Sequence, residues 1–82
     1  MLLREFFRYT NPDEDILLIA NELDDSYTIV EKNVGICRRR DLPNKYLNYI
    51  LMHVTTTIEN HKSVLKVYVV NNWDMENEDD EI

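Results

Sequence analysis

The sequence has few of the residues that cross-link a chain or turn it sharply. It contains one cysteine, one glycine and two prolines among 82 residues. A single cysteine excludes an internal disulfide framework and any zinc site built from several cysteines. The scarcity of glycine and proline excludes collagen-like and low-complexity classes. The 44% hydrophobic fraction excludes a chain that is disordered throughout, so the length predicts one small folded domain.

Long hydrophobic runs are also missing. Residues 16–20 form one of the longest apolar runs, and it is far shorter than the roughly 20 residues that a membrane-spanning helix needs. Charged residues interrupt the apolar N-terminus at Arg4, Glu5 and Arg8, which is untypical of a secretory signal. Together with the lack of disulfides, these features predict a cytoplasmic protein with no membrane partner.

Negative charge is concentrated at the C-terminus. The net charge of −7 comes from 16 acidic and nine basic residues. Residues 74–82, the acidic tail, hold six carboxylates and no base, which leaves ten acidic and nine basic residues in residues 1–73. We therefore expect a single domain over residues 1–73 and a disordered, solvated tail over residues 74–82. The tail either keeps the protein in solution or attracts a basic partner, including the protein's own arginines.

The first half of the chain predicts a helix followed by a β-hairpin. Residues 2–9 place apolar side chains on one helical face, and Pro12 ends that helix. Residues 15–21 and 27–31 are rich in strand-forming residues and are separated by turn residues, so residues 15–32 predict a hairpin. Lys32 and Asn33 indicate a further turn before a short extended piece at residues 34–37.

The second half predicts another helix and two more strands. Asp41 precedes Leu42 and Pro43, a combination typical of a helix start, so we expect a helix from Asp41 to about Tyr49. Residues 50–58 either extend this helix or form a strand, and six β-branched residues among the nine favour the strand. Its alternation would place His53 on the face opposite Ile50, Met52 and Val54. Residues 63–70 form the clearest strand pattern.

These elements predict an α+β fold in the order α-β-β-α-β-β. We expect a mainly antiparallel sheet of about four strands, with short helices on one face. The N-terminal Leu2-Leu3-Arg4-Glu5-Phe6 segment, the hydrophobic hairpin and the Asp41-Leu42-Pro43 helix start resemble small uncharacterised proteins of gut Firmicutes and their phages. The resemblance implies the same fold over residues 2–70 and a bacterial or phage setting. It implies no activity and no site residue.

Two groups of residues are candidates for contact with a partner. One is the run of three arginines, Arg38, Arg39 and Arg40, next to the predicted helix start. It is either solvated, bound to an anion or nucleic acid, or paired with the protein's own carboxylates. The other group is aromatic, because Tyr and Trp are common at interfaces; it comprises Tyr46, Tyr49, Tyr68 and Trp73.

The remaining reactive residues do not form a recognisable site. His53 and His61, with Cys37, do not have the number or spacing of zinc ligands. A nucleophile at Cys37 would need a base and an oxyanion site, although the adjacent arginines could lower its pKa. The sequence contains no phosphate-binding loop and no dinucleotide fingerprint. We therefore expect no enzyme, no metal and no cofactor.

The sequence thus favours a small interaction module that binds another protein or a second copy of itself. The alternative is a phage-type accessory or inhibitor protein. It would act on a nucleic-acid-processing machine through the acidic tail or the arginine run. We expect no direct binding to nucleic acid at physiological salt, since three arginines neutralise few phosphates.

Overall fold

The computed structural model describes residues 1–23 and 25–71. The elements follow the predicted order, with strands as the main component, so the α+β prediction is confirmed. The acidic tail and Trp73 lie outside the described residues. The helices are α1 (Leu3–Phe7) and the 3-10 helices η1 (Arg39–Asp41) and η2 (Asn44–Asn48); the strands are β1 (Asp15–Leu23), β2 (Ile29–Arg38), β3 (Ile50–Glu59) and β4 (Lys62–Val70).

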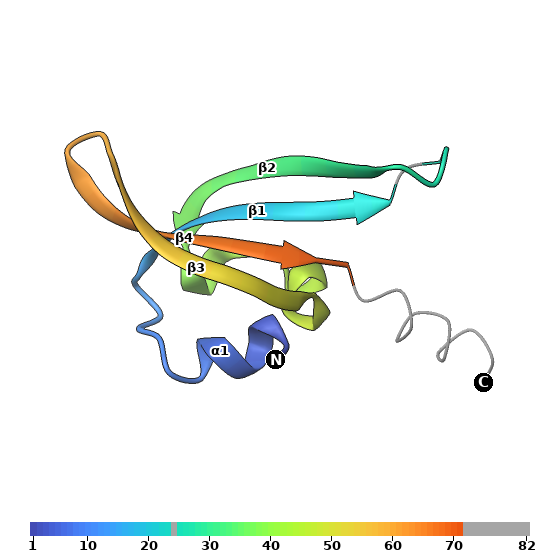
Figure 1. Ribbon diagram of the computed structural model, residues 1–82. Helices are drawn as coiled ribbons and strands as arrows, with labels where there is room; N and C mark the ends of the chain where they lie inside the picture. The colour runs from blue at the N-terminus through green and yellow to red at the C-terminus, as the bar shows by residue number, and fades with distance from the viewer. Residues whose placement is uncertain (24, 72–82) are drawn as a thin grey trace.

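The four strands form one sheet in the order β2-β1-β4-β3 (Figure 1). The hairpins β1–β2 and β3–β4 are antiparallel, as predicted. Their inner strands, β1 and β4, join in parallel, with Ile16 opposite Leu65 and Asn21 opposite Val70. The sheet is therefore mixed, and its central strands come from opposite halves of the chain.

The prediction that residues 50–58 form a strand is confirmed. Asn60 and His61 connect β3 to β4 with positive φ angles of 51° and 65°, the conformation of a tight two-residue hairpin turn. A bulge lies between Leu51 and His53, and it shifts the alternation of β3 by one position. The predicted facing of Ile50 and Met52 is therefore wrong, because both lie on the same face as His53.

The predicted helix from Asp41 to Tyr49 is absent as an α-helix. The segment forms η1 and η2 instead, separated by the extended residues Leu42 (ψ 133°) and Pro43 (ψ 136°). The ring of Pro43 disfavours helical backbone at the residue before it, which explains the break at Leu42. Proline at this point thus separates two short helical turns and does not begin one long helix.

The predicted turn at Lys32 and Asn33 is also wrong, because β2 runs straight through them. The strand absorbs one extra residue in a bulge opposite Leu18 and Ile19. Gly35 adopts a φ of +103° there, and its N–H donates a 2.9 Å hydrogen bond to Oδ1 of Asn33. The single glycine of the chain therefore lies where the backbone needs a conformation that other residues rarely adopt.

Helical segments cover only one face of the sheet. Figure 1 shows α1 and the two 3-10 helices on the lower side of the sheet, with no described element on the upper side. Leu3 and Phe7 of α1 pack there against alternate residues of β1 and β4. The buried residues of this covered face are Leu3, Phe7, Ile16, Leu18, Ala20, Leu42, Tyr46, Tyr49, Val67 and Val69.

Candidate functional site

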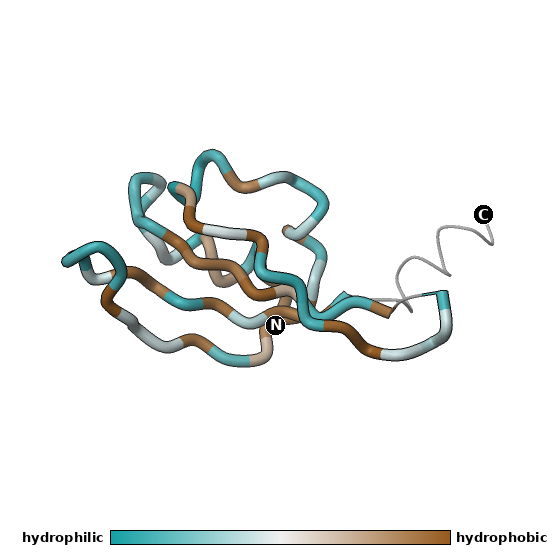
Figure 2. Tube along the Cα trace, turned by 90° about the horizontal axis from the view of Figure 1, so that it is seen from above, coloured by the Kyte–Doolittle hydropathy of each residue, from teal (hydrophilic) through white to brown (hydrophobic). Residues whose placement is uncertain are grey.

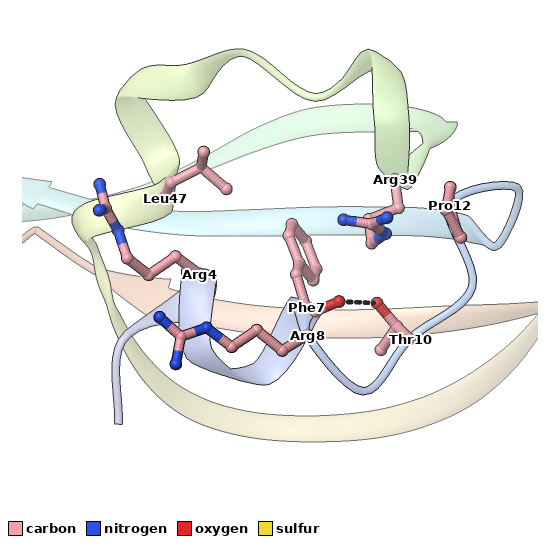
Figure 3. A pocket seen from close by; sticks show the side chains of 7 residues that line it. All are labelled: Arg4, Phe7, Arg8, Thr10, Pro12, Arg39 and Leu47. Atoms are coloured by element: carbon pink, nitrogen blue, oxygen red, sulfur yellow. Dashed lines mark hydrogen bonds between the residues drawn. The ribbon is translucent and has the colours of Figure 1, made fainter.

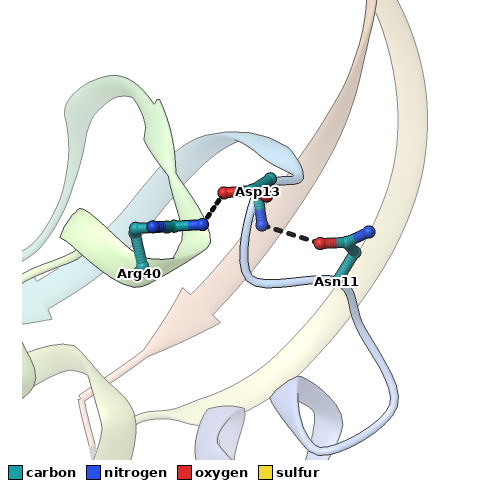
Figure 4. Close-up of polar contacts among 3 residues, drawn as sticks. All are labelled: Asn11, Asp13 and Arg40. Atoms are coloured by element: carbon teal, nitrogen blue, oxygen red, sulfur yellow. Dashed lines mark hydrogen bonds and ion pairs between the residues drawn. The ribbon is translucent and has the colours of Figure 1, made fainter.

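The structure separates the three arginines of the predicted cluster. Arg38 ends β2 opposite Asp15 and is exposed. Arg40 forms an ion pair with the carboxylate of Asp13 (Figure 4). Arg39 is half-buried and lines a cavity beside α1. The run therefore contributes one solvated, one paired and one half-buried guanidinium group.

Backbone hydrogen bonds hold Arg39 and Arg40 against the loop that follows α1. The N–H of Arg39 donates to the carbonyl of Glu14 at 2.9 Å, and the N–H of Arg40 donates to the carbonyl of Pro12 at 3.0 Å. The loop itself is turned by the side chain of Asn11, whose Oδ1 accepts a 2.9 Å bond from the N–H of Asp13 (Figure 4). These bonds fix where the side chain of Arg39 begins.

The cavity, named here the arginine pocket, lies between α1, the loop after it and the 3-10 helices (Figure 3). Its volume is about 440 Å³. Arg4 and Arg8 stand four positions apart at α1, so they share one side of it, whereas Arg39 enters from η1. The lining residues are Arg4, Phe7, Arg8, Thr10, Pro12, Arg39 and Leu47. Arg4 and Arg8 were not among the predicted contact residues, although their spacing on a predicted helix was visible in the sequence.

The side chain of Arg39 packs on the ring of Phe7 in this pocket. Its guanidinium carbon lies 5.7 Å from the ring centroid, within the range of a cation–π contact. Nε of Arg39 is buried and has no hydrogen-bond partner among the described residues. The hydroxyl of Thr10 donates to the carbonyl of Phe7 at 3.2 Å and so secures the end of α1 (Figure 3).

The second notable surface is the face of the sheet opposite the helices, named here the open face. Leu17, Ile19 and Val64 lie at its centre and are buried by their neighbours. Exposed apolar side chains surround them. Ile29 exposes 61% of its surface, Ile36 46% and Met52 58%. Figure 2 looks onto this face and shows hydrophobic positions recurring along the strands.

Tyr68, one of the predicted contact residues, lies on the open face. It packs against the buried residues there, and its ring centroid lies 5.9 Å from that of His53. The ammonium group of Lys66 lies 5.3 Å from the Tyr68 ring centroid. A hydrogen bond to Tyr68 raises the pKa of Lys66, with smaller contributions from nearby Glu31 and Glu59. Lys66 is therefore a cation at neutral pH.

Tyr46 and Tyr49 are placed in the covered core. They are 2% and 6% exposed, and their rings meet edge to face with centroids 5.1 Å apart. The hydroxyl of Tyr49 donates to the carboxylate of Glu22. Tyr68 is thus the member of the predicted aromatic group that the described structure places on an uncovered surface.

Cys37 and the histidines are not brought together. Cys37 lies on β2 opposite Ile16, on the covered face. His53 lies on β3 opposite Tyr68, on the open face. The two strands are the opposite edges of the sheet, about 14 Å apart at the usual strand spacing. Burial raises the pKa of the Cys37 thiol, and the charge of Asp41 raises it further, contrary to the lowering expected from the neighbouring arginines.

No group of three metal-ligating side chains occurs within residues 1–23 and 25–71. The same residues contain no helix long and apolar enough to span a membrane. No family model, curated protein or solved structure matches the chain. The geometry of the two surfaces is therefore the basis for functional inference.

Proposed function

We propose that the protein is a non-enzymatic, cytoplasmic interaction module that binds another protein through the open face. The observation that carries this proposal is the set of exposed apolar side chains on a sheet face that no described element covers. Sheets bury one face or both against another layer. Here the helical layer covers one face, and a partner would cover the other.

The size and composition of the open face support a protein partner. Strands of nine residues at ~3.3 Å per residue and four strands at ~4.8 Å give a face of roughly 600 Å². That is somewhat less than the ~800 Å² per partner of a standard interface. Tyr68 and Met52 belong to residue types enriched at interfaces. Since the face also carries Lys66 with Glu31 and Glu59 nearby, the expected partner presents apolar side chains together with polar or charged groups that match these three.

The separation of Cys37 from His53 supports a binding role over catalysis at the thiol. The pairing of Arg40 with Asp13 also leaves less free charge for phosphate contacts than the sequence alone suggested. For these reasons we place the nucleic-acid-machine hypothesis second.

The test compares matched substitutions on the two sides of the sheet. Ile36→Glu and Ile29→Glu place a carboxylate on the open face, whereas Ile58→Glu places one at a 76% exposed position on the other side. The full-length variants are used to capture partners from an extract of the source cells. A partner found by the wild type is then purified, and its dissociation constant is measured for each variant.

We expect the two open-face variants to weaken the complex at least tenfold and Ile58→Glu to change it less than twofold. If all three variants weaken the complex equally, or if none of them weakens it, the assignment of the open face is refuted. A dimer of the chain that Ile36→Glu dissociates would refute a foreign partner, because a second copy would then cover the face.

A further inference from the structure

We propose that the arginine pocket binds the phosphate group of a small organic phosphate ester. This site is separate from the open face, because its lining comes from the helical layer beneath the sheet. It would give the protein a small-molecule ligand in addition to a protein partner.

The charge of the pocket is unbalanced. Arg4, Arg8 and Arg39 line it, and none of its lining residues is acidic. Within the described part of the chain, the ion pair is made by Arg40, not by any of these three. Guanidinium groups remain charged at all accessible pH values, so the pocket carries positive charge that no lining residue balances. A bound anion would balance this charge.

The arginines of the pocket come from two elements. Arg4 and Arg8 come from the α1 side, and Arg39 comes from η1 on the other side of Phe7 (Figure 3). The side chains of Arg4 and Arg8 extend away from Arg39 in that view, so Arg39 would hold the anion directly and the other two would add positive charge at the rim of the pocket. One guanidinium group offers five N–H donors and accepts nothing. The terminal oxygens of a phosphate ester match the planar fork of arginine well.

The side chain of Arg39 is held in place before any ligand binds. Its backbone N–H is bonded to Glu14, its guanidinium group packs on Phe7, and Nε is buried without a partner among the described residues. Because Nε is buried, the terminal nitrogens are the part of the group that faces the cavity. A side chain held in place loses little entropy on binding, which favours affinity.

The apolar part of the lining indicates an ester and not free phosphate alone. Phe7, Pro12 and Leu47 provide carbon surface beside the arginines. The volume of about 440 Å³ lies in the range of small-molecule sites, about 300–1,000 Å³. The organic part of the ligand would lie on this surface.

The experiment titrates the full chain with three probes and follows backbone amide NMR shifts and binding heat. The probes are adenosine 5′-monophosphate, inorganic phosphate and adenosine. Adenosine monophosphate should bind with a Kd below about 10 mM and should shift the amides of α1 and η1. Inorganic phosphate should bind more weakly at the same residues, and adenosine should not bind measurably.

Matched variants locate the site. Arg39→Gln should weaken binding of adenosine monophosphate at least tenfold, and Arg8→Gln, an exposed change that spares the core, should weaken it at least threefold. Arg38→Gln removes the same charge from the neighbouring residue outside the pocket and should change affinity less than twofold. Thermal unfolding of each variant shows whether the fold is retained.

Three results would overturn the proposal. One is an equal effect of Arg38→Gln and Arg8→Gln, which would indicate unspecific charge attraction. Another is the absence of shifts at α1 and η1 with every phosphate probe. The third is tighter binding of duplex DNA than of adenosine monophosphate, with a steep salt dependence, which would assign the arginines to a nucleic-acid backbone.

Discussion

Leu17 and Leu18 are adjacent leucines of β1 that test the one-sided layering of the fold. Leu18 points into the covered face and is 0% exposed, whereas Leu17 points into the open face and is 7% exposed. Truncating either residue to alanine removes the same atoms. The surroundings differ, because helical segments close the space around Leu18 and only sheet neighbours surround Leu17.

The expected decreases in the free energy of unfolding follow from this difference in surroundings. Leu→Ala removes a transfer free energy of roughly 2 kcal/mol, and an enclosed cavity adds to it, giving about 3–5 kcal/mol for Leu18→Ala. The space left by Leu17→Ala opens to water, so we expect about 1–2 kcal/mol there. A chain of this length has a total stability of about 4–12 kcal/mol. Leu18→Ala therefore removes a large share of it.

Urea unfolding at low temperature, followed by circular dichroism, measures both variants against the wild type. Ile58→Ala, at a 76% exposed position, is the control and should stay within about 0.5 kcal/mol. If Leu17→Ala lowers the free energy of unfolding as much as Leu18→Ala or more, the open face is as tightly enclosed as the covered one. That result would also remove the basis for the proposed docking surface.

Three further predictions concern the edges of the fold. Because burial and Asp41 raise the pKa of the Cys37 thiol, its alkylation rate should rise at higher pH than that of a free cysteine peptide, and Asp41→Asn should reduce the difference. The raised pKa favours the protonated thiol, so its contribution to stability is lost as pH rises through the folded-state pKa. Gly35→Ala should cost about 1–3 kcal/mol in urea unfolding from backbone strain alone, since a Cβ there meets no atom within 4 Å; an unchanged stability would contradict the strain. Arg40→Gln should cost less than about 1 kcal/mol, because the side chains of Arg40 and Asp13 are 53% and 57% exposed.

The strands were predictable because their signal is local. The β-branched residues of 50–58 and the alternation of 63–70 carry the information for β3 and β4 in their own sequence. The break of the second helix was also encoded locally, at Pro43, but its ring fits a helix start as well as an interruption. The bulge at Met52 was not predictable, since strict alternation places Ile50 and His53 on different faces.

The pocket could not be predicted because it depends on tertiary contact. Arg39 reaches the pocket through hydrogen bonds between η1 and the loop after α1, and no spacing along the chain encodes these bonds. The sequence grouped Arg39 with its neighbours Arg38 and Arg40, whereas the fold groups it with Arg4 and Arg8. Likewise, no pattern within β1 or β4 indicates that the two strands pair with each other.

The parallel pairing of β1 with β4 also affects the order in which the protein is made. Ile16 and its partner Leu65 are 49 positions apart, so the middle of the sheet is completed by the last described strand to leave the ribosome. Until then β1 has a partner on one edge only, and its apolar residues lack half of their neighbours. The two hairpins can form early from local contacts, but their docking must wait and sets the pace of folding. During that interval the inner edge of β1 is an aggregation risk for the nascent chain.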